Sequence, residues 1–209
     1  MYLTRVQVDL ATALRAGLTD AYRWHQSLWT GFPGRDGQPR HFLTRVEERG
    51  QALEALVLAE TPPTPTEWGH WETRQLAPGF LEHEHYAFAL RANPTVKRVV
   101  RDESGQRRRN GRRTRICRPD ELRAWLDRKA AQGGFSVGGN LSVGAPVDQV
   151  CWRGQRQIVH SRVDFTGTLT VTDRELFLEA YRSGIGPAKA FGFGLLLIKP
   201  MRGEGRWTA

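Results

Sequence analysis

The stretch VDFTGTLTVTDRELFLEAYRSGIGPAKAFGFGLLLIKP, residues 163–200, decides the fold. Its first nine residues alternate between apolar and polar side chains, which predicts a strand whose inward face carries Val163, Phe165, Leu169 and Val171. Thr172 and Glu175 have the spacing of a capping box, so a helix is expected to follow this strand. Gly184 is expected to end the helix, and the apolar run at residues 195–198 predicts a last strand.

The segment before this stretch has a matching pattern. Tyr86, Phe88 and Leu90 alternate with smaller or polar residues and predict a strand. Residues 119–132, PDELRAWLDRKAAQ, predict a helix, because Pro119 suits a first turn and Gly133 suits the end. The sequence CWRGQRQIVHS at 151–161 predicts a hairpin. The second half therefore reads strand, helix, two strands, helix and strand, which is the order of a ferredoxin-like domain.

The first half resembles a less complete copy of the same order. Residues 2–8 alternate as a strand, and a helix capped by Thr19 or Asp20 is expected to run to about Trp29. HFLTRVE at 41–47 and ALEALVLAE at 52–60 predict two strands, followed by the turn TPPTPT at 61–66. Residues 67–84 show no clear period. We therefore predict an α+β chain of two tandem ferredoxin-like (RRM-like) domains, at residues 1–84 and 85–209, the first with a degenerate second half.

The charge of the chain is concentrated in one tract. The formal net charge is +9, and residues 91–118 contain eleven arginines or lysines against two acids, so the remainder is neutral. A dense basic tract of this kind is typical of proteins that bind a polyanion, because phosphate contacts supply most non-specific affinity for nucleic acids. A solvated loop that only aids solubility is the simpler alternative.

Several functional classes are disfavoured by the sequence. No apolar run is long enough for a transmembrane helix, and the N-terminus lacks the apolar core of a secretory signal, so a cytoplasmic protein without a membrane partner is expected. Two cysteines and no CxxC pair indicate reduced thiols. His83 and His85 have no third ligand at a recognised spacing, so neither a metal nor another cofactor is expected. The glycines of residues 184–194 follow a helix and precede a strand, which is the reverse of a dinucleotide fingerprint.

One pair of residues on the first predicted helix could carry chemistry. Tyr22 and His25 are three residues apart in AYRWHQSLW, so they lie on one helical face. Histidine exchanges a proton near neutral pH, and a phenol can donate a hydrogen bond to a reacting group. Taken alone, the pair is weak evidence, because a lone histidine on an amphipathic helix is more often structural or solvated, and Tyr22 could be a border residue with an apolar ring and a hydrogen-bonded tip.

Five blocks taken in order carry a resemblance to a known family. They are AYRWHQSLWTGFPG at 21–34, FLTRVE at 42–47, YAFALRANPTVKR at 86–98, FTGTLTVTD at 165–173 and GIGPAKAFGFGLL at 184–196. Together they resemble the CasE (Cse3) endoribonucleases of type I-E CRISPR systems over nearly the whole chain. This resemblance implies two tandem ferredoxin-like domains and metal-independent cleavage of CRISPR precursor RNA at each repeat hairpin. His25 and Tyr22 match the catalytic motif of the family.

The resemblance also implies partners. Members of the family stay bound to the cleaved crRNA and join the other Cascade subunits, so a monomer is expected outside that complex. The candidate RNA-binding residues are the basic side chains of the tract, the arginines of the predicted hairpin, and the glycine-rich loop with its lysine. They are Lys97, Arg98, Arg107, Arg108, Arg109, Arg112, Arg113, Arg115, Arg153, Arg156, Gly184, Gly186, Lys189, Gly192 and Gly194.

Two other functions remain open at this point. A ferredoxin-like module that holds structured RNA without cutting it would keep the basic tract and the glycine-rich loop but would not depend on His25. A DNA-binding architectural protein is disfavoured, because the sequence has neither a helix-turn-helix nor a basic-zipper pattern.

Overall fold

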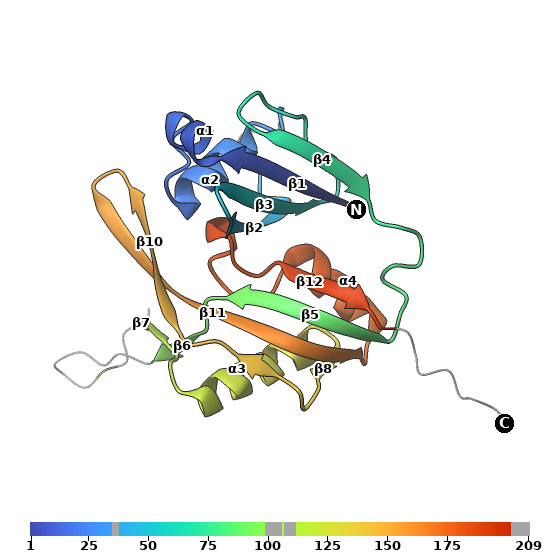
Figure 1. Cartoon of the computed structure of the whole chain (residues 1–209). Helices are drawn as coiled ribbons and strands as arrows, with labels where there is room; N and C mark the ends of the chain where they lie inside the picture. The colour runs from blue at the N-terminus through green and yellow to red at the C-terminus, as the bar shows by residue number, and fades with distance from the viewer. Residues whose placement is uncertain (35–37, 99–105, 107–111, 202–209) are drawn as a thin grey trace.

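The computed structural model describes residues 1–34, 38–98, 106 and 112–201, and it contains two antiparallel sheets that follow one another along the chain (Figure 1). Helices accompany each sheet, so the chain is α+β, as predicted. The boundary predicted between residues 84 and 85 falls directly before β5, the first strand of the second sheet. Within the described residues, no helix is both long and apolar enough to span a bilayer.

The first sheet has the strand order β2-β3-β1-β4, which is the order of a ferredoxin-like sheet. Its elements are β1 (Tyr2–Asp9), α1 (Leu10–Arg15), α2 (Ala21–Trp29), β2 (Phe42–Arg49), β3 (Ala52–Ala59) and β4 (His70–Gln75). Residues 60–69, between β3 and β4, contain no helix. The second half of this domain is therefore degenerate because it lacks the second helix, although its fourth strand, β4, is present.

The second sheet has the main order β10-β11-β5-β12, and two short strands, β8 and β9, also pair with β11. Its elements are β5 (His85–Ala92), α3 (Pro119–Gln132), β8 (Phe135–Val137), β9 (Ser142–Val143), β10 (Val147–Arg153), β11 (Arg156–Val171), α4 (Arg174–Ser183), the 3-10 turn η1 (Lys189–Phe191) and β12 (Leu196–Pro200). A separate two-stranded ladder joins β6 (Thr95–Arg98) to β7 (Arg112–Arg115). This arrangement agrees with a ferredoxin-like domain carrying an extra hairpin.

The structure corrects two details of the predicted second half. The predicted hairpin and the strand that follows it share one 16-residue strand, β11, while β8 and β9 arise from a glycine-rich segment for which no strand was predicted. The predicted capping box at Thr172 and Glu175 is wrong. Asp173 caps α4, because its Oδ1 accepts a hydrogen bond from the Leu176 backbone N–H at 3.0 Å.

The apolar cores explain why the start of β2 and most of β3 are hydrophobic. On one face of the first sheet, Trp24 and Leu28 of α2 lie in a cluster with residues of β1, β2 and β3. On the other face, Leu43 and Leu58 belong to the core of the second sheet. Because the first sheet is covered on both faces, it needs apolar side chains in both directions. The shared core fixes the two halves of the chain against each other.

Both cysteines are free in the structure. Cys117 is exposed in the segment before α3, whereas Cys151 is buried in β10 with its Sγ 3.7 Å from the Ile158 carbonyl oxygen. Burial raises the pKa of the Cys151 thiol, and Asp20 adds to this effect.

Candidate active site

Helix α2 is fixed at its start by one carboxylate. Asp20 Oδ1 accepts hydrogen bonds from the Tyr22 and Arg23 backbone N–H groups, each at 2.9 Å. Its Oδ2 accepts the Trp152 backbone N–H of β10, also at 2.9 Å. The same side chain therefore caps the helix and ties it to the projecting β10–β11 hairpin, so the helix begins where the sequence predicts.

His25 is partly buried and is held in its neutral form. Its Nε2 accepts the Trp29 indole N–H at 3.0 Å, and its Nδ1 is buried with no hydrogen-bond partner among the described residues. Burial, followed by the positive charge of Arg40, lowers the pKa of His25 to about 4. At neutral pH the imidazole can accept a proton but has none to give as an imidazolium.

The glycine-rich loop lies over α2. The Tyr22 ring stacks on Phe191 of η1, with 6.2 Å between ring centroids. His160 of β11 contacts the other side of this turn, at 4.5 Å from Phe191, and the Gln149 side chain donates to the Phe191 carbonyl at 2.9 Å. Residues from both halves of the chain thus meet at Phe191, next to the helix that carries His25.

The four predicted glycines do not share one role. The amides of Gly184 and Gly194 are already engaged, donating to the carbonyls of Ala180 and Arg91 at 2.8 Å each. A Cβ at Gly194, where φ is +87°, would lie 2.7 Å from the Ile185 carbonyl oxygen. These two glycines therefore close the loop.

Gly186 and Gly192 also have positive φ. Gly192 ends the 3-10 turn η1, whereas the Gly186 amide has no backbone partner within the described residues. The Gly186 amide therefore remains available to an anion.

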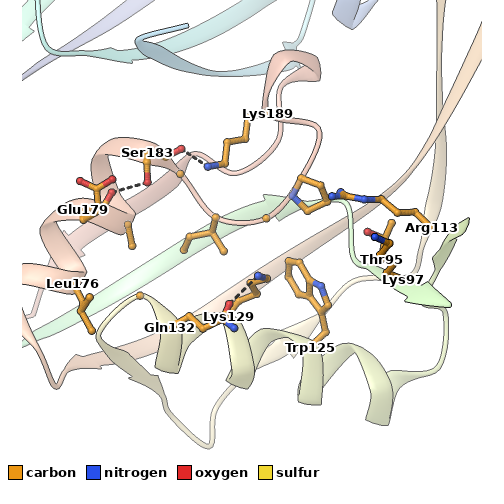
Figure 2. A pocket seen from close by; sticks show the side chains of 16 residues that line it. Thr95, Lys97, Arg113, Trp125, Lys129, Gln132, Leu176, Glu179, Ser183 and Lys189 are labelled. Carbon is orange, nitrogen blue, oxygen red and sulfur yellow. Dashed lines mark hydrogen bonds between the residues drawn. The ribbon is translucent and has the colours of Figure 1, made fainter. Parts of the chain in front are cut away.

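Lys189 lies at the edge of a cationic cavity of about 520 Å³, seen in Figure 2. Its Nζ donates to the Ser183 carbonyl at 2.5 Å, and burial together with Arg40 lowers the pKa of its ammonium group.

Lys97, Arg113 and Lys129 line the same cavity, with Glu179 as its carboxylate. The structure thus brings Lys97 and Arg113 of the predicted tract to the glycine-rich loop.

The remaining predicted contacts are spread more widely. Arg115 pairs with Asp148 at 2.9 Å, and Arg98 and Arg112 pair through their backbones in the β6–β7 ladder. Arg153 and Arg156 are exposed on either side of the turn between β10 and β11, which projects beyond the sheet in Figure 1. Arg107, Arg108 and Arg109 lie outside the described residues.

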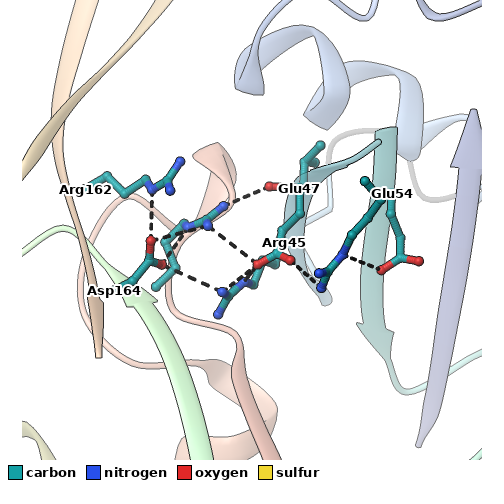
Figure 3. A network of polar contacts seen from close by, with 8 residues as sticks. Arg45, Glu47, Glu54, Arg162 and Asp164 are labelled. Atoms are coloured by element: carbon teal, nitrogen blue, oxygen red, sulfur yellow. Dashed lines mark hydrogen bonds and ion pairs between the residues drawn. The ribbon is translucent and has the colours of Figure 1, made fainter. Parts of the chain in front are cut away.

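A network of ion pairs and hydrogen bonds joins the first sheet to the second (Figure 3). Arg91 of β5 binds Asp164 of β11 with Nε–Oδ1 at 2.8 Å, and it also donates to the Val46 carbonyl of β2 at 2.8 Å. Arg45 binds Glu47 at 2.6 Å. Burial alone would raise the pKa of Asp164, but Arg91 and its neighbouring arginines outweigh it and hold the pKa below its ordinary value.

The sequence analysis missed two residues of the site. Arg40, directly before β2, shares a cavity with Lys189, and its charge lowers the pKa of both His25 and Lys189. His160 lies against Phe191, with its Nδ1 3.2 Å from the Asn93 amide nitrogen. Asn93 belongs to the block at 86–98 that carries part of the family resemblance, but no sequence pattern indicated its contact with His160.

Comparisons with known proteins extend over nearly the whole chain. A family model described as CRISPR associated protein matches residues 1–200. The CRISPR system Cascade subunit CasE of Escherichia coli is 30% identical over 96% of this chain and 100% of its own length. The CRISPR-associated endoribonuclease Cse3 of Thermus thermophilus is 28% identical, with the same coverage. A structure of Cse3 bound to 19 nt RNA has a TM-score of 0.77 at 26% identity, covering 96% of this chain and 100% of that one.

Proposed function

This chain belongs to the family of CRISPR-associated proteins, and on that premise we propose that it is the endoribonuclease that cleaves CRISPR precursor RNA at repeat hairpins. It then stays bound to the mature crRNA as a Cascade subunit in the cytoplasm. The full-length similarity to a CRISPR-associated endoribonuclease and to a Cascade subunit supports this function. The RNA-bound Cse3 structure supports RNA as the substrate.

The observation that carries the proposal is the meeting of α2 with the glycine-rich loop. Tyr22 stacks on Phe191, and His25 lies one helical turn further along the same helix. The two segments were selected separately from the sequence, one for proton transfer and the other for phosphate binding. Their contact supports one site that combines both capacities.

The reaction is an internal transfer at phosphorus. The ribose 2′-hydroxyl loses its proton, and its oxygen bonds to the adjacent phosphorus. The bond from phosphorus to the 5′-oxygen breaks, and that oxygen takes up a proton. The products are a 2′,3′-cyclic phosphate and a 5′-hydroxyl, with no water consumed. Because His25 is neutral, we assign it the role of general base, with the Tyr22 phenol orienting the 2′-hydroxyl or the phosphate.

To act as the general base, His25 must change its hydrogen bonding when RNA binds. Its Nε2 is occupied by the Trp29 indole, and its Nδ1 is enclosed. The 2′-hydroxyl can reach a ring nitrogen only if the indole N–H gives up its place, or if the imidazole rotates. Bound RNA is therefore expected to break the hydrogen bond between Trp29 and His25.

The RNA stem would be held mainly through its phosphates, because the deep major groove of A-form RNA hides the base edges. Arg153 and Arg156 at the hairpin turn form one cationic position, and Lys97 and Arg113 beside the loop form another. The free amide of Gly186 would meet a phosphate oxygen near the cut.

Cleavage of a labelled repeat hairpin in EDTA tests the function. Wild type should cut, whereas His25→Ala should cut at least about 100-fold more slowly. Binding is measured with a hairpin that carries one 2′-deoxy sugar before the cut site, and His25→Ala should bind it as tightly as wild type does. His70→Ala, which changes an exposed histidine on β4, is the matched control and should cut normally. If wild type binds the hairpin but does not cut it, the chain is an RNA-holding module instead.

A further inference from the structure

Arg40 enters the site from a segment that the predicted motifs do not include. It lines a cavity of about 590 Å³ together with Arg113 and the loop residues 186–190, including Lys189. This cavity contains no carboxylate, and within the described residues no Asp or Glu lies at ion-pair distance from Arg40. The guanidinium therefore faces the cationic side chains of Arg113 and Lys189 and the loop at residues 186–190.

The Arg40 guanidinium is also incompletely satisfied by the protein. Its Nε is buried and has no hydrogen-bond partner in the described part of the chain, and burial lowers the pKa of the group. A partly buried guanidinium without a carboxylate is costly, because its charge has lost water and gained no counter-charge. In contrast, Arg45 and Arg91 are buried close to Glu47 and Asp164.

The charge of Arg40 acts on the proposed base and on the lysine of the glycine-rich loop. It lowers the pKa of His25 and also that of Lys189. A cation with no carboxylate partner among the described residues, close to a proton-accepting imidazole, a lysine and the Gly186 amide, is suited to a group with two or more anionic oxygens. Arginine recognises such oxygens through two parallel N–H donors.

We propose that Arg40 is a further catalytic residue of the endoribonuclease, whose guanidinium binds the non-bridging oxygens of the scissile phosphate and stabilises the charge that builds on them during cleavage. The inference rests on the proposed function. It assigns to Arg40 the electrostatic part of the reaction, while His25 moves the proton. Arg40 therefore contributes more to the transition state than to the bound substrate.

Single-turnover cleavage of the repeat hairpin by Arg40→Ala and Arg40→Lys tests this role, with binding measured on the 2′-deoxy hairpin. We expect Arg40→Ala to cut about 10²–10³-fold more slowly, which is the usual effect of removing one donor that stabilises a transition-state oxyanion. Its binding should change less than about 5-fold. Arg40→Lys should fall between Arg40→Ala and wild type, because it keeps the charge but not the paired donors. Arg23→Ala, which removes an exposed arginine from α2, is the matched control and should cut like wild type.

A chemical readout separates this role from a structural one. Guanidinium ion at a concentration well below denaturation should speed cleavage by Arg40→Ala and leave Arg23→Ala unchanged. If Arg40→Ala fails to fold, Arg40→Lys decides the matter, and a rate within about 3-fold of wild type would overturn the proposal. A parallel loss of binding and cleavage in Arg40→Ala would also overturn it. In either case the contrast between wild type and His25→Ala would remain intact, so the proposed function would stand.

Discussion

Replacing Asp164 by asparagine tests how much the polar network that joins the two sheets contributes to the stability of the fold. The side chains keep nearly the same shape, but the carboxylate that binds Arg91 at 2.8 Å and 3.4 Å is lost. Arg162, at 3.1 Å, and Arg45, at 3.7 Å, lose the same partner. Glu47 then remains at ion-pair distance from Arg45 and Arg91.

The expected cost follows from burial. The Arg91 and Arg45 side chains are only 8% and 10% exposed, so their charges cannot recover full hydration. Breaking a buried pair by removing one partner costs about 3–5 kcal/mol. Because Glu47 persists and Asp164 is itself 32% exposed, we expect about 2–3 kcal/mol. For a chain of this size this lowers Tm by about 4–12 °C.

Urea denaturation measures this loss as a lower midpoint with an unchanged m-value. Glu72→Gln is the control, because it removes an exposed pair with Arg5 in which the side chains are 43% and 36% exposed. Such a pair is worth at most about 1 kcal/mol. The network lowers the pKa of Asp164 below its ordinary 3.8, so the difference between wild type and Asp164→Asn should persist at neutral pH and shrink as pH falls below about 4. If Asp164→Asn costs no more than Glu72→Gln, the reasoning about the network is refuted.

Trp29→Phe removes the donor to His25 Nε2, a hydrogen bond that favours the neutral ring, but leaves Arg40 in place, so the pKa of His25 should rise above about 4 and stay well below 6.5; histidine NMR titration measures it, and a return to 6.5 would show that burial and Arg40 are not what lowers this pKa. Because that pKa is depressed in the folded chain, wild type should lose up to about 3 kcal/mol of unfolding free energy as pH falls from 6.5 to 4, and His25→Gln should lack this loss. Gly194→Ala should lower the free energy of unfolding by about 1–3 kcal/mol more than Gly192→Ala does, as measured by thermal unfolding. Both positions have positive φ, but only at Gly194 would a Cβ lie 2.7 Å from the Ile185 carbonyl oxygen. Equal losses in the two variants would mean that the loop relaxes freely.

The sequence predicted elements whose side chains alternate between core and solvent, and it missed those without such a pattern. Strand β4 (His70–Gln75) was unassigned because it is an edge strand whose side chains are mostly exposed, so it needs no apolar face. Helix α1 is only six residues long, too short to show a helical period. The capping error at Thr172 arose because Asp173, the next residue, has an equally good acceptor.

The candidate site was predictable where it depended on a local motif. Tyr22 and His25 follow from one helix, and the loop glycines from one segment. The Gly194 amide, however, is engaged by the Arg91 carbonyl, on a strand far away in the sequence. Arg40 has no motif of its own, and its importance becomes visible only when β2 and the loop are folded together.

The unequal exposure of the two cysteines makes this protein convenient for covalent labelling. A thiol-reactive dye should attach to Cys117 and leave Cys151 untouched, because Cys151 is buried and its thiolate is disfavoured. Cys117 lies between β7 and α3, at the end of the basic tract. The unaltered chain therefore provides a single optical reporter beside the surface expected to bind RNA, and a titration with the repeat hairpin could be followed in real time without any substitution.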